Sequence, residues 1–167
     1  MGGRPARRLN GSPALRAGSQ AAAAADLHKR SLALYRQLND QAGAAAQITR
    51  LGRIANERGL YEESRALSNT ALEMRRQLGD LPGVAGVLDT LGFNAYRLGD
   101  GSAAAKFADE AVLINESIGH QAGVANAMRL KGMVASLQGN YAQAMTYYQD
   151  ALGPGWFDGE REPWQAA

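Results

Sequence analysis

The chain has 167 residues and a formal net charge of only +2. Alanine supplies much of the 46% hydrophobic share and aromatic residues make up only 7%, a composition that favours closely packed helices over a sheet. Cysteine is absent, so disulfides, thiolate metal sites and cysteine nucleophiles are excluded. No run of about 18 apolar residues is present, so we expect no membrane-spanning helix.

The first segment, residues 1–19, carries arginines and no acidic residue. Such a start is typical of an organelle transit peptide or a nucleic-acid-binding arm, and also of a disordered leader or the frayed edge of a longer chain. Because Pro5, Pro13 and several glycines interrupt it, we expect no long helix here and interpret it as a disordered leader. The arginines are Arg4, Arg7, Arg8 and Arg16.

A leading helix is predicted over residues 20–38. It is followed by three near-copies of one phrase at intervals of 40 residues, which are LNDQAGAAAQITRLG from Leu38, LGDLPGVAGVLDTLG from Leu78 and IGHQAGVANAMRLKG from Ile118. Within a unit, small and apolar residues recur at i, i+3 and i+7, as at Ile48, Leu51 and Ala55, which predicts amphipathic helix. We therefore expect one structural unit built repeatedly.

Glycine occupies two kinds of aligned position in these units. Gly59 follows the first helix of its unit, where a left-handed residue is needed and glycine costs least. Gly52 lies inside a helix, where glycine costs about 1 kcal/mol relative to alanine, so we expect a neighbouring helix to leave no room for a side chain. The sequence thus predicts helical pairs over residues 42–78, 82–118 and 122–152. The aligned sets are Gly59, Gly99 and Gly139, and Gly52, Gly92 and Gly132.

The C-terminal segment, residues 153–167, contains too many glycines and prolines to continue the last helix. Two interpretations remain open for its aromatic residues Trp156, Phe157 and Trp164. They either fold back as a cap over the open face of the last helix or extend away from it.

The aligned columns are carried by LGRIANERGLYEESRALSNTAL (51–72), LGFNAYRLGDGSAAAKFADEAV (91–112) and KGMVASLQGNYAQAMTYYQDAL (131–152). They resemble the tetratricopeptide repeat (TPR), and the resemblance covers about residues 42–152. It implies an all-α, right-handed solenoid of antiparallel helix pairs, with the leading helix as the second helix of a further unit. The usual unit has about 34 residues, so we expect the extra length in a longer second helix and linker. This extended form is similar to the arrays of large bacterial ATP-binding transcriptional regulators.

Three positions depart from the repeated pattern. Gly101 replaces a tyrosine, Ser64 replaces an alanine and Lys131 replaces a leucine. We expect these departures to weaken the regularity of the stack without changing the fold.

No motif indicates catalysis, a cofactor or a metal site. The phosphate-binding pattern GxxxxGK[ST] and the zinc motif HExxH are absent. His28 and His120 lie apart, with His120 in a linker column, and the adjacent acids Glu62–Glu63 and Asp109–Glu110 point about 100° apart on a helix. Acids and bases nearly cancel beyond the leader, which argues against direct nucleic-acid binding. We therefore expect no enzyme.

The resemblance implies that the first helices of the units line a concave groove. The periodicity independently places a second stripe beside the buried one. A solvated face has little reason to carry Phe93 and Tyr96 together, and aromatic anchors beside arginines are typical of peptide-binding surfaces. Phe93 could instead fill the gap left by neighbouring glycines and alanines. The candidate groove residues are Arg53, Asn56, Asp89, Phe93, Tyr96, Arg97, Asn126, Arg129 and Met133.

The sequence thus predicts a non-catalytic, cytoplasmic module that binds a protein or peptide in bacterial signalling or transcriptional regulation. Thr49 and Asp89 disfavour the lysine and asparagine set of chaperone-binding relatives. One alternative is a small-molecule-sensing segment detached from a larger regulator, which requires an enclosed pocket at Phe93 and Tyr96. In such a fragment Leu27, Leu34 and Leu38 of the leading helix are exposed and favour self-association into a homo-oligomer.

Overall fold

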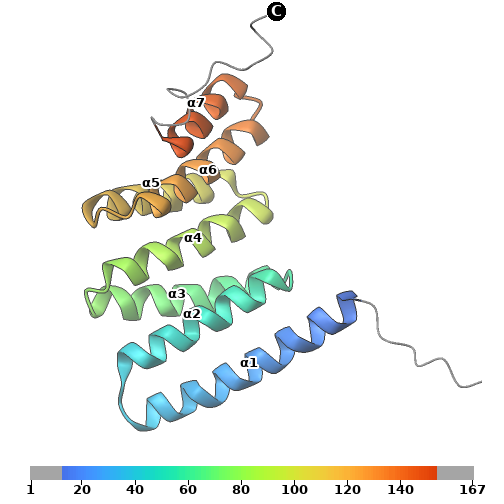
Figure 1. Cartoon of the computed structure of the whole chain (residues 1–167), viewed down its shortest axis with the longest axis vertical. Helices are drawn as coiled ribbons and strands as arrows, with labels where there is room; N and C mark the ends of the chain where they lie inside the picture. Colours follow the sequence, from blue (N-terminus) through green and yellow to red (C-terminus); the bar gives the residue numbers. More distant parts are fainter. Residues whose placement is uncertain (1–12, 154–167) are drawn as a thin grey trace, which may run out of the picture.

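The computed structural model describes residues 13–153, with side chains from residue 18 onward, and these residues form helices without any strand. The helices follow one another in chain order from α1 to α7 along the long axis (Figure 1). The expectations for residues 1–12 and for Trp156, Phe157 and Trp164 lie outside the described residues. The helices are α1 (Pro13–Gln37), α2 (Gln41–Glu57), α3 (Tyr61–Gln77), α4 (Leu81–Arg97), α5 (Gly101–Ser117), α6 (Gln121–Leu137) and α7 (Tyr141–Leu152).

Each helix packs against its neighbours in the chain. In addition, the backbones of α2 and α4 and those of α4 and α6 lie close together, whereas the backbones of α1, α3, α5 and α7 do not approach one another as closely. The first helices of the units are therefore crowded together and the second helices are spread apart, which makes the α2–α4–α6 side the concave one. The predicted all-α solenoid of antiparallel helix pairs is confirmed.

The connections between helices repeat the same geometry throughout. Gly59, Gly99 and Gly139 have φ of 74°, 81° and 78°, so the predicted left-handed caps are confirmed. The turns between units also use left-handed residues, which the sequence analysis did not assign. Helices α2 to α6 all have 17 residues and every connection has three. The sequence analysis placed the extra length of the unit in the second helix and linker, but the two helices of a unit are equally long.

The leading helix begins earlier than predicted. Helix α1 starts at Pro13 rather than near residue 20, so the part of the predicted leader from residue 13 onward is helical. Proline is well tolerated in the first turn of a helix, because its missing N–H has no partner there. The alanines from Ala21 to Ala25 are the best helix formers and carry the helix forward.

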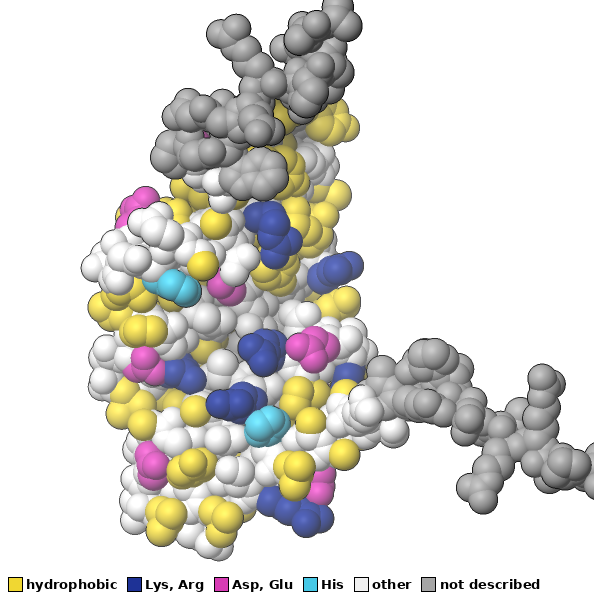
Figure 2. All heavy atoms as spheres, viewed as in Figure 1, with side chains coloured by type: hydrophobic (Ala, Val, Ile, Leu, Met, Phe, Trp, Pro, Cys, Tyr) yellow, Lys and Arg dark blue, Asp and Glu magenta, His cyan; other side chains and the backbone are white. Residues whose placement is uncertain are grey.

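One face of α1 is uncovered. Leu27, Leu34 and Leu38 are 65%, 60% and 73% exposed, as predicted. Apolar side chains reach the surface over α1, at the bottom of the view in Figure 2. In the next unit the residues of the same columns, Leu67 and Met74, pack against the core, because α2 covers them. Among the described residues α1 has no such first helix beside it.

The aligned glycines Gly52, Gly92 and Gly132 lie at close contacts with a neighbouring helix, as predicted. A Cβ on Gly52 would lie 2.9 Å from Ser68 Oγ of its own second helix. A Cβ on Gly92 would lie 2.5 Å from Leu130 Cδ2 of the next first helix. A Cβ on Gly132 would lie 2.5 Å from Tyr148 Cε1 of its own second helix. These columns therefore stay free of side chains because a neighbouring helix occupies the space.

Two glycines of α4 provide a matched test of this packing. A Cβ at Gly86 would meet nothing within 4 Å, whereas at Gly92 it would clash with the fully buried Leu130. Both changes to alanine gain the same helix propensity, about 1 kcal/mol. We therefore expect Gly86→Ala to raise the free energy of unfolding. The free energy of unfolding of Gly92→Ala should be about 1–3 kcal/mol lower than that of Gly86→Ala. Urea unfolding of the two variants measures the difference, and equal stabilities would contradict the packing described here.

Candidate functional site

The predicted groove stripe forms a contact cluster between α4 and α6. The guanidinium carbon of Arg129 lies 4.9 Å from the centroid of the Phe93 ring, a cation–π distance. An amino group of the same arginine is 3.7 Å from Met133 Sδ. Phe93 and Tyr96 also pack against the buried cluster around Leu130 and keep part of their surface exposed. Phe93 therefore both fills space beside the small residues and faces the groove.

Asp89 lies on the same stripe of α4, one turn before Phe93. Its side chain is half-buried, and its Oδ1 atom is buried without a hydrogen-bond donor from the described residues. Burial raises the pKa of Asp89 to about 6, while the positive charges of Arg129 and His120 act in the opposite direction. The buried, unpaired oxygen agrees with the raised pKa, because burial without a donor disfavours the charged carboxylate.

Asn56, the predicted groove residue of α2, is engaged in a buried polar network. Its Nδ2 donates to Oδ1 of Asn94, and Asn94 Nδ2 donates to Ser64 Oγ at 2.8 Å. Ser64 Oγ in turn donates to the backbone oxygen of Gly52 at 2.6 Å. The network joins α2, α3 and α4, so Ser64 ties the stack together instead of weakening it. A polar Asn94 in a column otherwise held by Ile54 and Val134 was the available signal for it.

The remaining predicted groove residues have different surroundings. Arg53, Arg97 and Asn126 are exposed, and none makes an ion pair or a side-chain hydrogen bond with another described residue. The small-molecule alternative requires an enclosed pocket at Phe93 and Tyr96, whereas both rings remain partly exposed. The structure therefore brings Asp89, Phe93, Arg129 and Met133 together and leaves the three exposed residues without a side-chain bond to this cluster.

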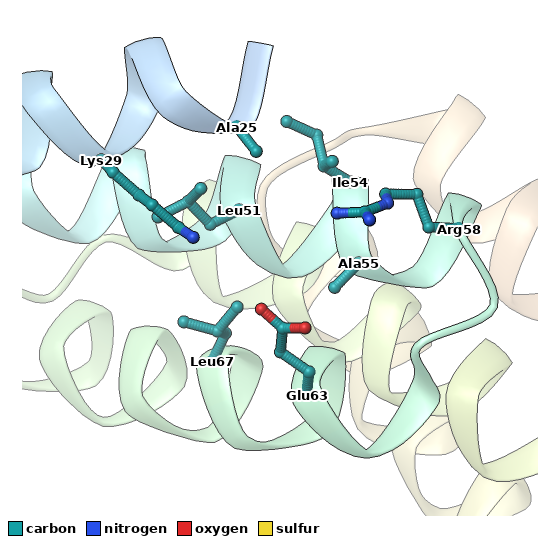
Figure 3. Close-up of a pocket in the computed structure, with 8 residues that line it drawn as sticks. All are labelled: Ala25, Lys29, Leu51, Ile54, Ala55, Arg58, Glu63 and Leu67. Carbon is teal, nitrogen blue, oxygen red and sulfur yellow. The ribbon is translucent and has the colours of Figure 1, made fainter. Parts of the chain in front are cut away.

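Clefts also open on the other side, between neighbouring second helices. One of about 60 Å³ lies between α1 and α3 over α2, where Figure 3 shows the side chains of Lys29, Arg58 and Glu63 extending into the cleft. A larger cleft of about 270 Å³ lies between α5 and α7 over α6. Its eight lining residues occupy the same repeat positions, two units further along, as those of the first. The cleft is thus a consequence of the repeat geometry.

The third departure from the repeat, Lys131, lies in this larger cleft. Its ammonium group is 2.7 Å from Asp109 Oδ1 and 4.6 Å from the Tyr147 ring centroid. Burial alone would lower the pKa of Lys131, but Asp109 and Tyr147 outweigh it and raise the pKa above its ordinary value. Glu110 pairs with Arg76 instead, so the adjacent acids 109 and 110 do not form a shared carboxylate site.

The two histidines have structural surroundings. His28 Nδ1 is 2.8 Å from Gln47 Oε1, which joins α1 to α2. His120 precedes α6 as its N-cap residue, and its Nδ1 is 3.0 Å from Asn115 Oδ1. Within residues 13–153, His and acidic side chains form no group of three or more that could hold a metal ion. None of the helices in that range is long and apolar enough to cross a membrane.

The raised pKa of Asp89 predicts a pH-dependent effect of Asp89→Asn. The unfolded carboxyl group loses its proton near pH 3.8 and the folded one near pH 6. The stability that protonated Asp89 contributes is therefore present below pH 3.8 and lost as the pH rises through about 6. The free energy of unfolding of Asp89→Asn, relative to wild type, should rise by ~2–3 kcal/mol between about pH 4 and about pH 7.5.

Urea unfolding at the two pH values measures this change. The constant effect of an asparagine amide cancels in the comparison, because it does not depend on pH. Asp150→Asn, at an exposed position of α7, serves as the control and should show no such rise. A difference between Asp89→Asn and wild type that stays constant with pH would contradict the burial of this carboxyl group.

Comparison with known proteins agrees with this architecture. No curated protein matches the sequence. The chain is similar in structure to BtubC (BKLC) from P. vanneervenii, with 22% sequence identity and a TM-score of 0.65. The similarity covers 86% of this chain and 60% of BtubC, so the chain spans less than two thirds of that protein. Residues 84–153, which include α5 to α7 and most of α4, match the family model described as Tetratricopeptide repeat. Together with the helical pairs that begin at α2, this match confirms the resemblance to tetratricopeptide-repeat proteins that the sequence indicated.

Proposed function

We propose that the chain is a non-catalytic interaction module that binds a peptide or protein segment on its concave face. Tetratricopeptide repeats generally mediate protein–protein interaction, and their all-α solenoid is typically a scaffold without catalytic activity. We place this role in the cytoplasm, in bacterial signalling or transcriptional regulation, on the resemblance of the extended repeats to those of bacterial regulators.

The observation that carries this proposal is the cluster of Phe93, Arg129 and Met133. It presents a partly exposed aromatic ring, a flexible thioether and an exposed guanidinium on two adjacent first helices. Aromatic and arginine side chains dominate the binding energy of many interfaces, and methionine adapts to different apolar partners. The concave face therefore offers an anchor for a side chain of a partner.

A paired-variant pull-down tests the proposal. The double variant Phe93→Ala, Arg129→Ala removes the anchor, and it should lose proteins that the wild-type chain recovers from a lysate of its source organism. The loss should reach about tenfold or more, since interface anchors contribute roughly 2 kcal/mol or more each.

A matched double variant on the other side of the solenoid is the control. Leu113→Ala, Lys106→Ala also removes one large apolar and one basic side chain, but from exposed positions of α5. It should recover the same proteins as the wild type. Equal recovery by the groove variant and the wild type would show that the cluster is not the binding surface.

The exposed face of α1 favours a second candidate, in which the chain functions as one segment of a longer array or as a homo-oligomer. Leu27 and Leu34 occupy columns that a first helix covers in the later units. Each exposed leucine leaves apolar surface in contact with water. Burying that surface would stabilise the protein by about 25 cal/mol per Å². A helix with the same apolar face as α2 would complete the contact, and in its absence a second copy can cover the leucines.

A register-matched graft tests this second candidate. Replacing residues 1–20 with a copy of residues 41–60 places a first helix and its connection directly before residue 21, as in the next unit. We expect a higher melting temperature and the loss of any self-association seen by analytical ultracentrifugation. The same graft with Ile48→Glu and Leu51→Glu in the copied helix is the control, since it cannot bury against α1. A wild-type chain that stays monomeric and melts at the temperature of its graft would rule this candidate out.

A further inference from the structure

Charge is distributed unequally between the two kinds of helix. Each of the five ion pairs found among the described residues includes at least one residue of a second helix. The three arginines of the predicted groove take part in none of them. They are Arg53 on α2, Arg97 on α4 and Arg129 on α6, and all three are exposed.

Acidic residues on the first helices are few. Glu57 at the end of α2 is exposed, and the other acid of these helices is Asp89, whose Oδ1 is buried. The second helices and the turns carry the remaining acids of the described residues. The first helices therefore carry the three exposed arginines of the predicted groove outside any ion pair among residues 13–153, against the two carboxylates of Glu57 and Asp89.

The groove is also open at the backbone of α4. Gly86 is exposed, and a Cβ built on it would meet nothing within 4 Å. It lies one turn before Asp89, whose Oδ1 lacks a donor. Since the other units carry Ala46 and Asn126 in this column, the middle unit gives a ligand backbone the closest access.

We propose that the partner on the concave face is an acidic, extended peptide segment that carries at least one aliphatic or aromatic side chain. This proposal rests on the proposed function and deepens it. Carboxylates of the segment pair with the three arginines, and its apolar side chain packs on Phe93 and Met133. Neighbouring helices lie roughly 8–10 Å apart, so ~6 extended residues bridge the three first helices.

Selection from a random peptide library tests both the proposed binding of a peptide and the acidic character of that peptide. Displayed peptides of about twelve residues, twice the ~6 that bridge the groove, are selected on the full chain without further assumption about charge. Dissociation constants of enriched peptides are then measured by fluorescence anisotropy, at low and at high salt, for the wild type and three variants. Circular dichroism melts check that each variant remains folded.

The variants separate charge from access. Arg53→Glu, Arg97→Glu, Arg129→Glu reverses the groove charge. Gly86→Trp fills the open space on α4, where an added side chain meets no neighbour. Ala66→Trp places the same ring at an exposed position of α3, on the other side, as the matched control.

We expect enriched peptides with net negative charge that bind the charge-reversed variant at least about tenfold more weakly and lose affinity as salt rises. Gly86→Trp should weaken them similarly, and Ala66→Trp should not. Neutral or basic peptides that Gly86→Trp blocks but charge reversal does not would overturn the acidic partner and keep the groove. If no peptide is enriched, or if Gly86→Trp has no effect, the proposed function itself is wrong.

Discussion

A left-handed backbone residue ends the helix once every twenty positions, and the alignment of all other features depends on it. Asn39 and the glycines at 59, 79, 99, 119 and 139 all have positive φ. Each of them sits in a three-residue connection, so helices α2 to α6 have the same length. A helix longer or shorter by one residue would rotate every later side chain by about 100°. The columns seen in the sequence remain columns in space only because this spacing does not vary.

Because the helices have equal length, the aligned glycines come to lie where neighbouring helices contact one another. Gly52 lies under Ser68, Gly92 under Leu130 and Gly132 under Tyr148, so one column of glycines meets three different neighbours. Because glycine offers only backbone, each neighbour contributes the side chain that fills the gap. The packing columns therefore demand a small residue on one side and tolerate variety on the other.

The sequence alone predicted features that follow from the residue type at one aligned repeat position. It did not predict contacts between residues at two different repeat positions. Periodicity predicted the helical pairs, the left-handed cap at Gly59 and the close contact at Gly52, since each follows from a residue type at a repeated position. The bond from Asn94 to Ser64 requires knowing that two departures from the pattern meet across units. The start of α1 was predicted too late, because proline was treated as a helix breaker rather than as a first-turn residue.

The candidate groove could likewise be predicted only in part from the sequence. The stripe that carries Asp89, Phe93 and Arg129 could be predicted from helix periodicity, but the cation–π contact between Arg129 and Phe93 depends on the spacing between α4 and α6. The buried oxygen of Asp89 depends on the same spacing.

The position of this stripe beside the packing columns explains how one fold can carry different partners. The column of Gly52, Gly92 and Gly132 is restricted to glycine by close contact. The next residue along each helix is Arg53, Phe93 or Met133, three side chains with no common chemistry. A substitution there changes the charge or shape of the concave face while the helix contacts are kept. The positions that face the groove are thus adjacent in sequence to the positions that pack the helices. The two kinds of position can change separately, except where a side chain such as Phe93 contributes to both.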